Sequence, residues 1–249
     1  MIGTELAVDD SGATMFARYA HAPNALGYCG PPGEDGMVRK RPERIREAAE
    51  RFSGAWPYLR VLAEMTGIAD PLDRRLVESY WLGGGIAAAL DREEFLDRLL
   101  AVIGPQAGHY WSHLTSDLRG EAAPNHCFHV FGVYPWSRLL GCGRDAEPLN
   151  VLDSCRISWG TVLDSDGVTA DVLGRRLTWE GSRLALSGAV VRRVAARAEE
   201  YGPLRLNPGD AVAIHWDRVC GLLTPEQAAA LDAGTWWQLQ VTNRRCVPT

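Results

Sequence analysis

The chain has 249 residues, of which 46% are hydrophobic and 23% charged, a balance that supports a sizeable core in one large or two small domains. With 31 acidic against 26 basic residues, it lacks the basic surplus of nucleic-acid-binding proteins, so we expect no nucleic-acid partner. No apolar run approaches the ~18–20 residues of a membrane-crossing helix, and the first residues, MIGTELAVDD, lack signal-peptide features. We therefore expect a cytoplasmic protein with no membrane partner.

The first part of the chain, to about residue 145, is predicted to be mainly helical. Proline and acidic residues near Pro42 and Asp70, a cap at Asp91, and glycines at Gly67 and Gly83 are typical of helix starts and ends. The helices that these signals predict cover 42–52, 56–65, 70–82, 93–102 and 105–118. The apolar segment 126–140 gives no clear pattern.

After Gly143 short strands are predicted, separated by turn signals such as Asp166-Gly167. The predicted strands cover 156–163, 168–173, 175–179, 183–186 and 211–216. A helix is expected from the Thr224-Pro225 start to near the end of the chain. The fold class we predict is α+β, with a helical domain over 1–147 and a small β-barrel with a C-terminal helix over 148–249.

The six cysteines show no CxxC spacing, so neither a disulfide framework nor a zinc knuckle is predicted. Any cysteine that acts should act singly, as a thiolate. Cys29 lies in a loop rich in glycine and proline, residues 24–32, which suits a nucleophile or metal ligand as well as it suits a tight turn. Both interpretations stay open.

Four histidines form a second candidate group. His109 and His113 are four residues apart on a predicted helix, a spacing that suits metal ligands, and His126 and His129 follow. The same spacing also occurs on packed or solvated helical faces. There is no GxSxG, GxGxxG or Walker motif, which argues against a serine hydrolase and against a nucleotide-driven enzyme.

The strongest pattern lies in the C-terminal third of the chain. It consists of Cys155 with the following residues RISWGTV, the segment 208–215 (PGDAVAIH), the apolar segment 219–223, and an alanine-rich acidic helix. This order resembles the HypC/HupF family of hydrogenase maturation chaperones, over about residues 153–235. The resemblance implies an OB-like barrel that binds iron carrying cyanide and carbon monoxide. Soft, low-spin iron of this kind suits a thiolate ligand.

Carried over by residue, the resemblance implies Cys155 as the iron ligand and His215 as its partner, with Cys29 or His129 added from the helical domain. The implied partners are a hydrogenase large-subunit precursor and other maturation proteins. Three features depart from the family: Cys155 lies inside the chain instead of at its start, Trp159 stands where the family has proline, and the stretch between Val162 and Gly209 is longer.

Through FARYAHAPNALGYCGP, FHVFGVYPW and CRISWG, the whole chain also resembles an uncharacterised bacterial family that we associate with nickel–iron hydrogenase gene neighbourhoods. Two alternatives to a maturation chaperone stay open. One is an iron- or cysteine-dependent enzyme with Cys29 and one of His126, His129 or His215 as catalytic residues at an interdomain cleft. The other is an interaction module with inert cysteines.

Overall fold

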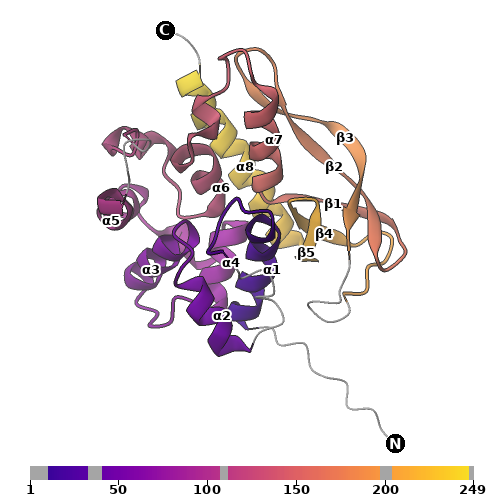
Figure 1. Cartoon of the computed structure of the whole chain (residues 1–249), viewed down its shortest axis with the longest axis horizontal. Helices are drawn as coiled ribbons and strands as arrows, with labels where there is room; N and C mark the ends of the chain where they lie inside the picture. The colour runs from indigo at the N-terminus through magenta and orange to yellow at the C-terminus, as the bar shows by residue number, and fades with distance from the viewer. Residues whose placement is uncertain (1–10, 33–40, 107–111, 197–203, 247–249) are drawn as a thin grey trace, which may run out of the picture.

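The computed structural model describes residues 11–32, 41–106, 112–196 and 204–246, in which helices come first, five strands follow, and a long helix ends the chain (Figure 1). The α-helices are α1 (Gly12–Ala25), α2 (Pro42–Ala49), α3 (Ala55–Thr66), α4 (Arg74–Leu82), α5 (Arg92–Ile103), α6 (His126–Phe128), α7 (Ala146–Cys155) and α8 (Pro225–Cys246). Shorter turns are the 3-10 helices η2 (Gly85–Ala89), η3 (Gly104–Gln106), η5 (Ser116–Glu121) and η7 (Pro135–Arg138), and the π-helix η6 (His129–Val133).

Local end signals place the helices that the sequence predicted. The side chains of Asp73 and Asp91 accept hydrogen bonds from backbone N–H groups at the starts of α4 and α5. Gly67 ends α3 in the left-handed conformation, with φ of 72°. The predicted helices over 42–52, 56–65, 70–82 and 93–102 are thereby confirmed with small shifts at their ends.

Two expectations for the first part, the helix over 105–118 and the loop over 24–32, were wrong or incomplete. The predicted helix over 105–118 is replaced by η3 and η5, and residues 107–111 lie outside the described residues. The helix α1 extends into the predicted 24–32 loop, and segment 126–140 forms α6, η6 and η7. Residues 147 and 148, where the sequence suggested a domain boundary, lie inside α7. Cys155 is the last residue of this helix and does not open a strand.

The five strands are β1 (Ser158–Ser165), β2 (Thr169–Trp179), β3 (Leu184–Ala195), β4 (Ala211–His215) and β5 (Arg218–Leu222). Neighbours pair in the order β1-β2-β3-β5-β4, β4 pairs again with β1, and β3 meets β5 through one residue pair, Ala195 and Arg218. Two predicted strands, 168–173 and 175–179, form the single strand β2, with an irregularity between Arg175 and Leu177. The α+β class and the C-terminal helix are confirmed.

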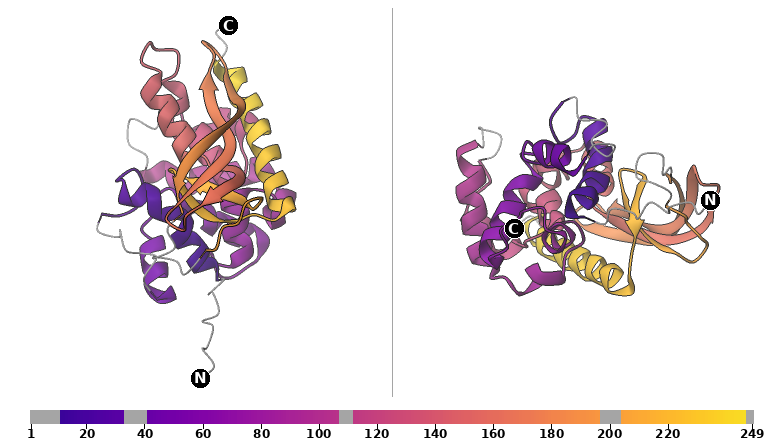
Figure 2. Two further views of the ribbon diagram at one scale, coloured as in Figure 1. Left: turned by 90° about the vertical axis from the view of Figure 1, so that its right-hand side faces the viewer. Right: turned by 90° about the horizontal axis from the view of Figure 1, so that it is seen from below.

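The hydrophobic core crosses the predicted domain boundary. The largest cluster joins Phe16 and Trp81 of the helical part to Ala213 and Leu231 of the later part. A second cluster joins α7, the β2–β3 hairpin and α8, and the hairpin stands between these two helices (Figure 2). The helical and β parts therefore share buried surface, and side chains from both can meet at one place.

Among the described residues, no helix combines the length and the apolar character that crossing a bilayer requires.

Candidate metal site

Three buried side chains converge where the helical and β parts meet. His126 begins α6, Cys155 ends α7 and His215 ends β4, and their potential ligand atoms all lie within 4.8 Å of one another. The three residues are 5%, 5% and 1% exposed. A thiol and two imidazoles in this proximity form a donor set suited to transition metals.

Backbone contacts fix the elements that carry these side chains. The Asn125 side chain caps α6 by accepting a hydrogen bond of 3.1 Å from the N–H of Phe128. The N–H of Trp216, next to His215, donates to the carbonyl of Ser154, next to Cys155, at 2.9 Å. The end of β4 is thereby tied to the end of α7.

The ring of His215 is held in one tautomer. Its Nδ1 lies 2.7 Å from the backbone carbonyl of Tyr19 on α1, and because a carbonyl only accepts, Nδ1 must carry the proton. The lone pair of the neutral ring is therefore on Nε2. That atom is buried and has no hydrogen-bond partner among the described residues. Metal-binding histidines are commonly fixed in this way by a carbonyl on the other nitrogen.

His126 belongs to a chain of hydrogen bonds. Its Nε2 lies 3.0 Å from the Cys155 carbonyl, so in the metal-free protein Nε2 is the donor and Nδ1 the acceptor. The Tyr80 hydroxyl, 3.1 Å from Nδ1 of His126 and 3.1 Å from Nδ1 of His129, donates to the first and accepts from the second. Tyr80 therefore links the two imidazoles.

Burial keeps both histidines of the group in the neutral form that binds metals. It lowers the pKa of His215 to about 4, and the carbonyls of Tyr19 and Cys155 offset part of that effect. It also lowers the pKa of His126 well below the ordinary value, helped by the neighbouring His215 and His129. Neither imidazole needs to lose a charge before it coordinates a metal.

The thiol of Cys155 is protonated at neutral pH because burial raises its pKa to about 12, with the Trp216 side chain acting in the opposite direction. A metal ion that binds here must displace that proton, as it does at other cysteine sites. Cys155 is therefore inert as a nucleophile in this conformation.

Brief iodoacetamide treatment of the native protein is expected to label Cys142, which is exposed, and to spare Cys155 and Cys220. Burial raises the pKa of both spared thiols to about 12, so little thiolate is present. Peptide mass spectrometry measures each site separately, and labelling in denaturant provides the reference. Labelling of Cys155 as fast as that of Cys142 would contradict the burial described above.

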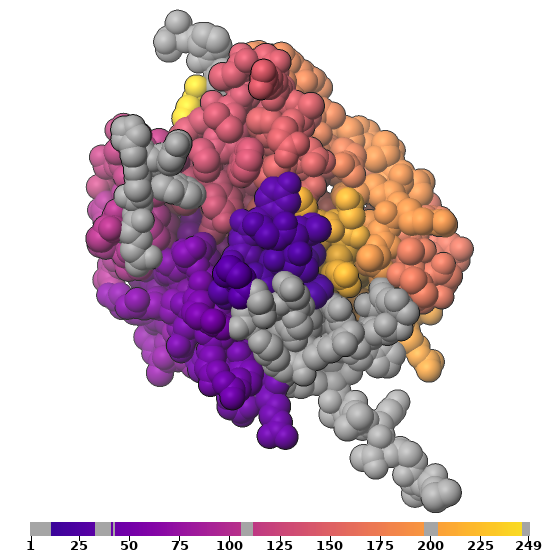
Figure 3. Space-filling view, in the orientation of Figure 1, coloured from indigo at the N-terminus to yellow at the C-terminus, as the bar shows by residue number. Residues whose placement is uncertain are grey.

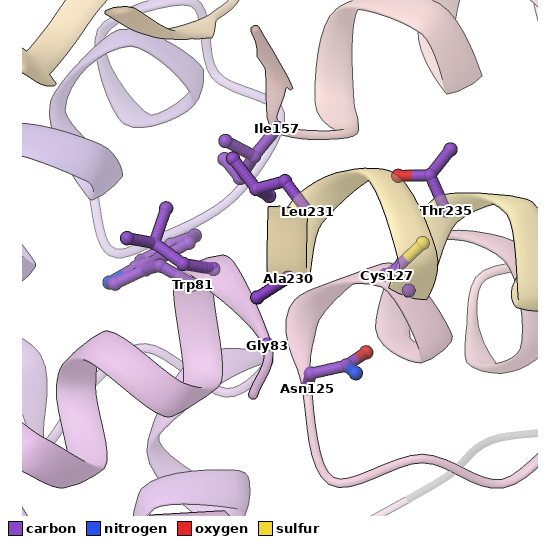
Figure 4. Close-up of a pocket in the computed structure, with 10 residues that line it drawn as sticks. Trp81, Gly83, Asn125, Cys127, Ile157, Ala230, Leu231 and Thr235 are labelled. Carbon is purple, nitrogen blue, oxygen red and sulfur yellow. The ribbon is translucent and has the colours of Figure 1, made fainter. Parts of the chain in front are cut away.

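An indole ring separates the histidines from a small cavity. Trp81 of α4 lies with its ring centroid 4.7 Å from that of His126 and 5.7 Å from that of His215. Trp81 also lines a cavity of about 20 Å³, together with Asn125 and with Thr235 of α8 (Figure 4). That volume holds about one water molecule. The cavity ends at Trp81 and is no part of the three-residue group.

The residues predicted from the sequence are distributed unevenly around this group. Cys155 and His215, predicted together, lie in it. His129 does not, because it bonds to Tyr80 and stacks on Tyr58 at 5.1 Å; burial lowers its pKa to about 3. Cys29 is half-buried, and its pKa is raised by burial and further by the charge of nearby Cys155.

The other histidine pair does not form a site in the described residues. His109 lies outside them, and Nε2 of His113 lies 2.8 Å from the carbonyl of Val133. His126, by contrast, was named from the sequence in the histidine group and as one of three partners for Cys29, but not with Cys155. No spacing rule relates it to Cys155, because the packing of α6 on α7 brings them together.

The chain matches a family of unknown function, DUF6390, over residues 8–249. No curated protein and no solved structure matches it.

Proposed function

Because the chain belongs to the DUF6390 family, whose function is unknown, we propose a function from its site: the protein binds a transition-metal ion. The ligands are Sγ of Cys155, Nε2 of His215 and a ring nitrogen of His126. The metal would tie α6, α7 and β4 together at the junction of the helical and β parts.

One observation carries the proposal: Nε2 of His215 is buried and has no hydrogen-bond partner among the described residues, and a ring nitrogen of His215 lies within 4.8 Å of the Cys155 sulfur. A buried polar atom left unpaired costs about 1–3 kcal/mol. Polar atoms that persist unpaired call for an explanation, and a metal ion supplies one here.

The donor set narrows the choice of metal. One thiolate and two imidazoles suit iron, zinc and copper and disfavour magnesium and calcium, which prefer oxygen. On the resemblance of residues 153–235 to HypC/HupF, we propose iron carrying cyanide and carbon monoxide as the cargo. The five strands would then be a relative of that family's small barrel, and the cargo would pass to a hydrogenase large-subunit precursor.

Delivery by this route requires the site to open, because Cys155 is only 5% exposed. The segment 26–32, which follows α1, is the cover that would have to move. Its Tyr28 is 43% exposed and lies with its ring centroid 4.1 Å from that of Trp216, beside His215. The exposed part of residues 11–32, in indigo, lies between the purple part of the surface and the yellow and orange parts (Figure 3).

A second candidate is an enzyme that acts on a small molecule at the same place. Its candidate catalytic residue, Cys29, is half-buried and lies near Cys155, but burial raises the pKa of the Cys29 thiol, which weighs against a nucleophilic role. A Cys29→Ser variant distinguishes the two candidates. In a carrier it should leave bound metal in place, whereas in this enzyme it should abolish turnover.

The test is metal analysis with infrared spectroscopy on protein purified without oxygen from a host that expresses the hydrogenase maturation system. We expect about one iron per chain with cyanide and carbon monoxide bands, both lost in Cys155→Ala and in His215→Gln. Cys127→Ala is the matched control, since its thiol is also shielded but borders the small cavity instead of the group. Iron without the bands would favour the enzyme. Wild-type protein that neither retains a metal nor binds added Fe²⁺, Co²⁺ or Zn²⁺ would contradict the proposal.

A further inference from the structure

The turn that follows His215 is strained. Trp216 and Asp217 connect β4 to β5 with φ of 51° and 54°, and they are the only residues other than glycine with positive φ in the described parts of the chain. A two-residue hairpin turn with both positions at positive φ favours Asn-Gly or Gly-Gly. Neither position here is glycine, and backbone strain of this kind concentrates at functional sites.

Several contacts hold the strained turn in place. The Asp217 carboxylate pairs with the guanidinium of Arg192, which is 7% exposed and also donates to Ser158. The Asp217 carbonyl accepts from the N–H of Ala195 at 2.8 Å, and the N–H of Trp216 donates to Ser154 at 2.9 Å. The position of the Trp216 side chain is thus fixed from both ends of the turn.

The Trp216 side chain packs on the cluster that contains Cys155, and its N–H group is unpaired among the described residues. The ring of Trp216 lies under that of Tyr28, and the nitrogen of the N–H group, Nε1, is buried.

We propose that the Trp216 indole N–H is the hydrogen-bond donor to the Cys155 thiolate when that sulfur binds metal, which makes Trp216 a positioning residue. The inference rests on the proposed metal site. Donors to a coordinating sulfur stabilise its negative charge and orient it, and such outer groups change metal affinity by about 10–100-fold. The strained turn carries the indole N–H of Trp216 at this position, whereas a glycine turn would carry no side-chain donor there.

The experiment is a titration of the full-length, reduced protein with Co²⁺, followed by the thiolate-to-metal charge-transfer band. Trp216→Phe keeps the aromatic ring against Tyr28 and removes the N–H. We expect its dissociation constant for Co²⁺ to rise about tenfold and its band to shift to lower energy, because the sulfur lone pairs are no longer stabilised. Trp179→Phe is the matched control, because Trp179 also packs on the cluster that contains Cys155 and its buried Nε1 has no partner among the described residues.

A second variant separates loss of the donor from damage to the fold. Replacement of Trp216 with benzothienylalanine, in which sulfur stands in place of the N–H, preserves the shape of the side chain. The same shift in band and affinity in both Trp216 variants supports the proposal. A wild-type titration with a charge-transfer band that Trp216 variants leave unchanged overturns it while leaving the metal site intact. A wild-type protein that shows no such band overturns both.

Discussion

Asp153→Ala is expected to destabilise the folded protein by about 3–5 kcal/mol, because it leaves a buried arginine without its charged partner. The side chains of Arg156 and Asp153 are 2% and 3% exposed, and one carboxylate oxygen accepts from Nε and Nη2 of Arg156 at 3.1 and 2.9 Å. The same oxygen accepts from the N–H of Leu177 at 2.7 Å, which ties α7 to β2. Arg176 forms a further ion pair with the other oxygen at 2.5 Å.

Urea unfolding of three variants tests this account. The control is Asp171→Ala. Asp171 of β2 also pairs with an arginine, Arg193 of β3, but the side chain of Arg193 is 70% exposed. We expect this variant to lose less than about 1 kcal/mol of folding stability. The double variant Asp153→Ala with Arg156→Met should be less destabilised than Asp153→Ala alone, because it removes the stranded charge. Equal losses for Asp153→Ala and Asp171→Ala would show that burial of the pair contributes nothing.

Local signals explain which elements could be predicted. The helices α3, α4 and α5 begin or end at caps and glycines that act within a few residues, so their sequence reveals them. The helix α1 has no such visible pattern. Nearly every residue in it is buried, from Gly12 to Asn24, so it shows no apolar stripe, and it contains Pro23.

The second missed helix, α7, had a different cause. Its sequence, AEPLNVLDSC, contains an interior proline, and the motif that begins at Cys155 led to the prediction of a strand there. The cysteine lies at the end of the helix, and β1 begins only at Ser158. The motif identified the residue, whereas the backbone conformation around it depended on packing against β2 and α8.

The residues of the candidate site also differ in whether the sequence alone could identify them. Cys155 and His215 could be paired from the sequence through a resemblance, although 60 positions separate them in the chain. His126, Tyr80 and Trp216 could not be assigned, because their places depend on contacts between α4, α6 and the β4–β5 turn. Only long-range packing creates those contacts, and no spacing in the sequence encodes them.

Tyr80→Phe is expected to cost about 2–6 kcal/mol of folding stability although it removes a single oxygen atom. That oxygen donates to Nδ1 of His126 and accepts from Nδ1 of His129, so its loss leaves two buried ring nitrogens without partners, at about 1–3 kcal/mol each. A second effect should appear in metal binding. The ring of His126 loses the contact that orients it, and such contacts change metal affinity by about 10–100-fold.

The matched control is Tyr58→Phe. Tyr58 packs on the same rings, 5.3 Å from Tyr80 and 5.1 Å from His129, but its buried hydroxyl has no partner among the described residues. Removal of an unpaired buried hydroxyl should leave stability unchanged or raise it. Urea unfolding and Co²⁺ titration of both variants measure the two effects. Equal stability of the two variants would show that the His126–Tyr80–His129 chain contributes nothing. A stability loss in Tyr80→Phe with unchanged Co²⁺ affinity would show that the His126–Tyr80–His129 hydrogen bonds stabilise the fold and do not affect metal binding.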